Sequence, residues 1–126
     1  MRPKTPILLY CCDQELLSSI AFVLRLHPYE VTAVHDSTDV VIMSARNKLV
    51  CGILIHAQQG DLAGRLVHRI LECASHMPLL LVDRAGDLAP VRYADMVLYG
   101  RNTSMTHILA ALDVLCKRGA QPRSAA

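Results

Sequence analysis

The sequence has few aromatic side chains and no long hydrophobic run. Trp is absent, Phe occurs once and aromatic residues make up 4% of the 126 residues, so aliphatic side chains must fill any core. No stretch approaches the roughly 20 apolar residues of a membrane-spanning helix, so no membrane anchor is predicted. The cations are scattered, and few rings are present to stack on bases. We therefore expect no direct nucleic-acid binding.

A secretion signal and a disulfide framework are also missing. Arg2 and Lys4 precede the apolar stretch 6–12, but this stretch is too short for a signal peptide, and Asp13 follows at once. The cysteines are odd in number and lie mostly in apolar contexts, which is typical of reduced thiols in the cytoplasm. They are Cys11, Cys12, Cys51, Cys73 and Cys116.

Length and composition predict one globular domain. Hydrophobic residues make up 52% of the chain and charged residues 19%, which favours a packed core over disorder. A chain of 126 residues is also the size of a single domain. Gly119 is expected to end the last helix, so we predict a domain over 1–118 and a loose tail over 119–126.

Short apolar runs alternate with helix-period segments about five times along the chain. The predicted strands cover 7–11, 29–34, 50–55, 79–82 and 96–99. The expected caps of the first, second and last helices are Asp13, Ser37, and Thr103 or Ser104. A third helix is predicted from the stripe Leu62, Leu66 and Ile70, and 83–93 has room for only a short fourth helix.

This alternation predicts an α/β fold, with a doubly wound parallel sheet and right-handed crossovers. In such sheets, functional residues gather where the strands end, at the carboxyl edge. The predicted strand ends are Cys11-Cys12-Asp13, His56-Ala57, Asp83-Arg84 and Tyr99-Gly100-Arg101.

Five stretches together resemble the receiver domain of response regulators (the CheY-like superfamily), over about residues 6–118. They are 7–17 for the first strand and helix, 29–31 for the second strand, 60–64 for the loop into the third helix, 78–82 for the fourth strand and 94–98 for the last strand. The resemblance implies a flavodoxin-like (βα)5 fold with strand order 2-1-3-4-5. The short separation of Asp83 and Gly100 implies that the fourth helix is shortened.

The resemblance also indicates that the phosphorylation pocket is degenerate. The two acidic residues that receivers place after the first strand fall on Cys11 and Cys12. The phosphoacceptor Asp, eight residues before the position of Gly64, falls on His56. The chain is thus similar to a pseudo-receiver that lacks the phosphoacceptor.

The remaining pocket positions differ in the same way. The switch Ser or Thr falls on Asp83, and the Lys-Pro pair falls on Gly100 and Arg101. Receiver phosphorylation needs a carboxylate nucleophile and Mg²⁺, which prefers oxygen ligands. Thiols and imidazole are poor magnesium ligands. We expect neither Mg²⁺ nor phosphorylation of an Asp at this site.

Other interpretations of these residues stay open. Cys11 and Cys12 could form a thiol switch or bind a metal, or each could pack as a small hydrophobic residue on opposite faces of the strand. His56 could be a ligand, a pH-responsive group or a phosphoacceptor, or a packed side chain with one hydrogen bond. If a metal binds, Cys12, His56 and Asp83 would hold Zn²⁺ or Cu, with Cys11 or water completing the shell.

A set of Cys, His and Asp side chains is also a combination that enzymes use for nucleophilic catalysis. No Gly-rich phosphate loop follows Cys12, however, and no oxyanion-hole motif is visible, so we expect no enzymatic activity.

The sequence therefore supports two functional hypotheses. The first is an atypical receiver-like domain in two-component-type (phosphorelay) signal transduction of the bacterial kind, which acts as a phosphorylation-independent protein interaction module without a cofactor. It would dock onto a protein partner or form a homodimer, through the first helix or the face of the shortened fourth helix. It would be a stand-alone domain or an N-terminal piece of a longer regulator. The alternative is a thiol- or metal-sensing domain that uses Cys11, Cys12, His56 and Asp83 on the same fold.

Overall fold

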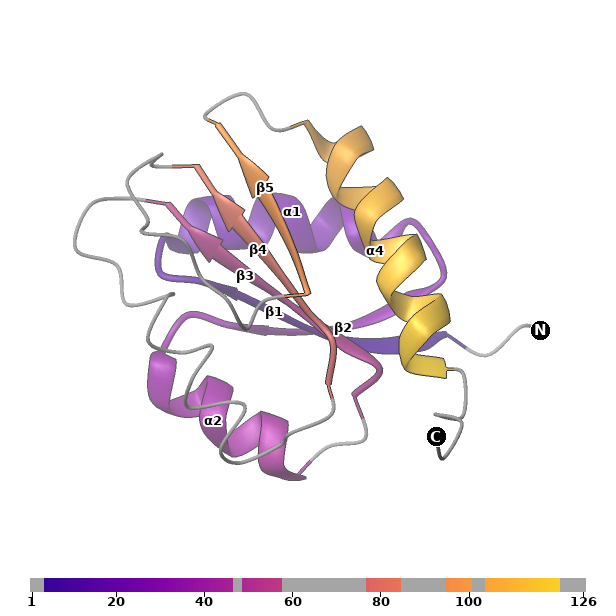
Figure 1. The fold of residues 1–126 in the computed structure, drawn as a ribbon. Helices are drawn as coiled ribbons and strands as arrows, with labels where there is room; N and C mark the ends of the chain where they lie inside the picture. The colour runs from indigo at the N-terminus through magenta and orange to yellow at the C-terminus, as the bar shows by residue number, and fades with distance from the viewer. Residues whose placement is uncertain (1–3, 47–48, 58–76, 85–94, 101–103, 121–126) are drawn as a thin grey trace.

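The chain forms a five-stranded, all-parallel sheet in which the strand order is β2-β1-β3-β4-β5 (Figure 1). The computed structural model describes residues 4–46, 49–57, 77–84, 95–100 and 104–120. The predicted flavodoxin-like fold and its strand order are confirmed.

The described elements alternate between strand and helix. In chain order they are β1 Thr5–Cys11, α1 Gln14–Arg25, β2 Tyr29–Val34, α2 Ser37–Arg46, β3 Cys51–His56, β4 Leu79–Asp83, β5 Met96–Tyr99 and α4 Met105–Ala120. The predicted third helix, the predicted short fourth helix and the loop 58–60 lie outside the described residues.

Local sequence signals place most boundaries correctly. β2 and β5 have the predicted bounds. β3 is shifted by one residue, from the predicted 50–55 to Cys51–His56, and β4 runs one residue further than predicted, to Asp83. Asp13 caps α1, because its Oδ1 accepts hydrogen bonds from the backbone N–H groups of Glu15 and Leu16 at 3.0 and 3.2 Å.

Two predicted helix boundaries are wrong. Asp36, not Ser37, caps α2, because its Oδ1 accepts the Thr38 N–H at 2.8 Å, and Ser37 is already helical. α4 continues through Gly119 to Ala120, although Gly119 was predicted to end it. Glycine ends a helix when it adopts a positive φ; in the described residues the glycine that does so is Gly100.

Helices cover both faces of the sheet. α1 and α4 lie on one face and α2 lies on the other (Figure 1). The strand residues Leu9, Ile53 and Leu80 point to the α1/α4 face, while Leu54 and Leu81 point to the α2 face. This alternation follows from the two-residue period of a strand and explains why β3 is buried at every position.

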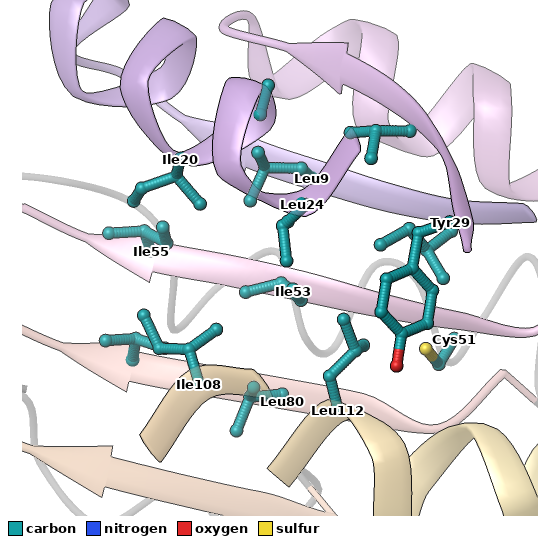
Figure 2. Packing of buried hydrophobic residues seen from close by; sticks show 14 of the residues in the cluster. Leu9, Ile20, Leu24, Tyr29, Cys51, Ile53, Ile55, Leu80, Ile108 and Leu112 are labelled. Atoms are coloured by element: carbon teal, nitrogen blue, oxygen red, sulfur yellow. The ribbon is translucent and has the colours of Figure 1, made fainter. Parts of the chain in front are cut away.

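The larger core cluster lies between the sheet and the pair α1 and α4. Figure 2 shows Ile20 and Leu24 from α1 and Ile108 and Leu112 from α4 on either side of Ile53. All five are at most 3% exposed, and each contributes about 1.5–3 kcal/mol through burial. This packing holds α4 against the centre of the sheet. Of the helices that the structure describes, none is long and apolar enough to cross a membrane.

Candidate functional site at the carboxyl edge of the sheet

The predicted site residues lie where β1, β3, β4 and β5 end. The strand register aligns Cys11 with Ile55, His56 with Asp83, and Asp83 with Tyr99. Hydrogen bonds continue this register beyond β3 and β4. The Arg84 N–H donates to the His56 carbonyl at 2.9 Å and the Gly100 N–H donates to the Asp83 carbonyl at 3.0 Å. The fold thus brings His56, Asp83 and Gly100 together at one edge.

Strand alternation separates the two neighbouring cysteines. Cys11 is fully buried in the cluster under α1 and α4, whereas Cys12 is half-buried and packs against the cluster under α2. Leu54 and Leu81 belong to this cluster under α2. His56 lies two residues after Leu54, and Asp83 lies two residues after Leu81. Cys12, His56 and Asp83 therefore share one face, and Cys11 lies on the other.

His56 and Asp83 are the buried polar side chains of this edge. Their exposed fractions are 2% and 1%, while Cys12 next to them is half-buried. A buried carboxylate or imidazole is costly unless the protein supplies polar partners. Here both side chains are withdrawn from solvent.

Gly100 has a backbone conformation that suits glycine. Its φ is 108°, and a Cβ added to it would meet no heavy atom within 4 Å. The space is therefore open, but the backbone disfavours any L side chain. The sequence comparison with receivers predicted that their Lys position falls on Gly100. Arg101, the other residue predicted at the Lys-Pro pair, lies outside the described residues.

The acidic side chain nearest to the end of β1 is already used structurally. Asp13 is exposed, and both of its described hydrogen bonds go to backbone N–H groups of α1. A carboxylate in this role stabilises the first turn and is also favoured by the helix dipole.

The structure gives the metal hypothesis no ligand cluster. Among the described residues, no group of three or more His, Cys, Asp or Glu side chains is arranged to hold a metal ion. Cys12, His56 and Asp83 are all described, so sharing a face does not make them a ligand set. Cys11 and Cys12 both carry reduced thiols.

Sequence reasoning missed a different pair of cysteines, at the opposite edge of the sheet. The Sγ atoms of Cys51, at the start of β3, and Cys116, near the end of α4, lie 3.0 Å apart. These residues are 65 positions apart in the chain. One signal could have found them: a helix that follows a strand and packs back on a parallel sheet runs antiparallel to the strands, so its last turns lie over the strand starts.

No protein-family model matches the sequence, and comparison with curated proteins finds no match. Solved structures share its fold. The signal receiver domain of an HD domain-containing protein from Pseudomonas fluorescens Pf-5 aligns with a TM-score of 0.83 at 17% identity, over 100% of this chain and 96% of that one. A response regulator receiver domain protein from Clostridium thermocellum aligns with a TM-score of 0.78 at 20% identity, over 90% and 95% of the two chains.

A third neighbour has a metal in its cleft. The receiver domain of a sensor histidine kinase from Pseudomonas aeruginosa PAO1, with a magnesium ion coordinated in its active site cleft, aligns with a TM-score of 0.72. Its identity is 16%, over 90% of this chain and 98% of that one. At these identities the comparisons show a shared fold, which matches the receiver-like architecture predicted from the sequence.

Proposed function

We propose that this chain is a pseudo-receiver, a cytoplasmic receiver-like module of two-component-type signal transduction that acts by protein interaction and without phosphorylation or catalysis. The observation that carries this proposal is the pair His56 and Asp83. At the carboxyl edge, these side chains are 2% and 1% exposed, at the positions where a receiver needs an accessible carboxylate and a hydroxyl.

The chemistry of this edge supports the loss of phosphotransfer. An imidazole at position 56 cannot form the acyl phosphate that a carboxylate forms. Cys12 and His56 are poor ligands for Mg²⁺, which requires hard oxygen donors in octahedral geometry. Asp83 would also place a negative charge beside a phosphoryl group and repel it.

An exposed apolar pair on α1 supports the interaction part of the proposal. Phe22 and the C-cap residue Leu26 are 65% and 71% exposed, and they lie four positions apart on one face of the helix. Glu15 in the first turn and Arg25 in the last turn are exposed as well. The helix thus carries opposite charges at its two ends, with apolar side chains near one of them.

We assign this face to a second copy of the chain. If two copies pack their α1 helices antiparallel about a two-fold axis, Phe22 and Leu26 meet the partner helix, and Glu15 of each copy approaches Arg25 of the other. This arrangement buries the apolar pair and complements both charges, without any contribution from the carboxyl edge of the sheet.

Sedimentation velocity over a range of concentrations tests the proposal. The wild type should show a reversible monomer–dimer equilibrium that acetyl phosphate with Mg²⁺ does not change. Phe22→Asp and Glu15→Lys should weaken the dimer at least tenfold. Ile42→Asp, at a 40% exposed position of α2, is the matched control and should leave it unchanged. A wild type that stays monomeric, or a dimer that the phosphodonor shifts, would refute the proposal.

A further inference from the structure

Cys51 and Cys116 form a close thiol pair that plays no part in the proposed function. Their Sγ atoms are 3.0 Å apart, so one thiol donates a hydrogen bond to the other. A disulfide needs a separation of about 2.05 Å, so the two sulfur atoms must approach by roughly 1 Å. The packing of α4 on the sheet holds the two sulfur atoms at this separation.

The two thiols differ in their surroundings. Both are buried, but Cys51 is fully buried and Cys116 is 8% exposed, so Cys116 is the more accessible of the two. The hydrogen bond from Cys51 lowers the pKa of the Cys116 thiol, and the same bond together with burial raises the pKa of Cys51. Cys116 is therefore the thiol that ionises and meets a dissolved reagent first.

We propose that Cys51 and Cys116 are a redox modification site, at which a hydroperoxide converts the two thiols into one intramolecular disulfide. The Cys116 thiol loses its proton, and the thiolate attacks one oxygen of hydrogen peroxide. The O–O bond breaks, and the leaving hydroxide takes up the proton from Cys116 to form water. This gives a sulfenic acid on Cys116. Cys51 sulfur then attacks the Cys116 sulfur and expels a second water. The two thiols lose two electrons and two protons, and the peroxide is reduced to two waters.

The disulfide would fasten α4 to the sheet. Cys51 lies at the amino edge of β3, and Cys116 lies in the last turns of α4, so the bond closes a long loop of the chain between two packed layers. Such a bond restricts the unfolded chain, and we expect oxidation to raise the Tm by roughly 5–15 °C. The site is at the opposite edge from His56 and does not depend on the dimer or on the fate of the phosphorylation pocket.

Peptide mapping of the full chain tests the proposal directly. The freshly reduced protein is treated with hydrogen peroxide, its remaining thiols are alkylated, and it is digested with trypsin without reduction. Trypsin places the cysteines on four separate peptides, 5–25, 49–65, 70–84 and 102–117. The expected product is a cross-linked pair of 49–65 and 102–117, with an intact mass lower by two hydrogens. Both changes should reverse with a reducing agent.

Two variants and a matched control connect the bond to the change in Tm. Cys51→Ala and Cys116→Ala should show no peroxide-dependent rise in Tm. Cys11→Ala removes a cysteine that is equally buried in the same core cluster, and it should keep the full rise. The mapping of the wild type decides the question even if a variant does not fold.

The opposing results are equally clear. Cys51 and Cys116 both recovered as alkylated thiols after peroxide treatment would refute the proposal. So would a cross-link that joins either of them to peptide 5–25 or 70–84, or a rise in Tm that persists in Cys116→Ala.

Discussion

His56 and Asp83 lie opposite each other in the register of β3 and β4, as the last residues of two adjacent buried strands. An imidazole and a carboxylate thus replace the apolar side chains that fill the rest of both strands. Their exposed fractions, 2% and 1%, are as low as those of the core around them. The ends of β3 and β4 therefore belong to the interior, whereas the end of β1 does not, because Cys12 is half-buried and Asp13 is exposed.

The first prediction is energetic coupling between these two residues. His56→Ala and Asp83→Ala should each destabilise the protein by about 1–3 kcal/mol, because each removes a buried polar side chain from a packed edge. Their effects should be non-additive by roughly 0.5–3 kcal/mol in a double-mutant cycle measured by urea unfolding. Asp83→Ala combined with Tyr29→Phe, at the distant edge strand β2, is the control and should be additive. Additivity of the first pair would contradict the prediction.

The second prediction concerns side chains at position 100. Gly100 has a φ of 108° and open space around it, so its replacement is opposed by the backbone rather than by a clash. Gly100→Ala and Gly100→Lys should therefore lower the free energy of unfolding by a similar amount, about 1–2 kcal/mol. A Lys variant as stable as the wild type would show that the backbone does not exclude a lysine here.

The third prediction is a loss of stability at alkaline pH through Tyr29. Burial, followed by the negative charges of the nearby Cys116, Asp113 and Cys51, raises the pKa of Tyr29 to about 12. Figure 2 shows the ring of Tyr29 beside Cys51. Because the unfolded phenol ionises near pH 10, the unfolded state releases its proton first, and this contribution is present below pH 10 and lost between about pH 10 and 12.

Urea unfolding at a series of pH values checks this effect. Tyr29→Phe cannot ionise and should show a smaller decline in stability between about pH 10 and 12 than the wild type. Equal declines in the two proteins would assign the loss to other groups.

Much of the fold could be predicted from local signals. Pro28 restricts the chain before β2, and Asp13 offers a side-chain oxygen one residue before α1, so both boundaries follow from short-range chemistry. The position of His56 and Asp83 at one edge followed from the parallel order of the strands. Local signals failed at the start of α2, where the neighbouring residues Asp36 and Ser37 can both cap a helix. In the structure Asp36 is the cap, because its Oδ1 accepts the Thr38 N–H.

The chemistry of the site was harder to predict, because it depends on which face of the sheet each side chain lies on and on how deeply that side chain is buried. The sequence drew attention to the adjacent Cys11 and Cys12, which the strand sends to opposite faces. The close thiol pair is Cys51 and Cys116, which only the packing of α4 on β3 brings together. Burial of His56 and Asp83 to the depth of the core likewise depends on tertiary packing rather than on local sequence.

The most direct test of the central claim is the intact mass of the reduced full chain after incubation with acetyl phosphate and Mg²⁺. A receiver domain with a complete acidic pocket, treated in parallel, serves as the positive control. We predict that the control gains the mass of one phosphoryl group and that this chain gains none. A stoichiometric phosphoryl adduct on this chain, mapped to His56, Asp83 or another residue of the carboxyl edge, would contradict the account.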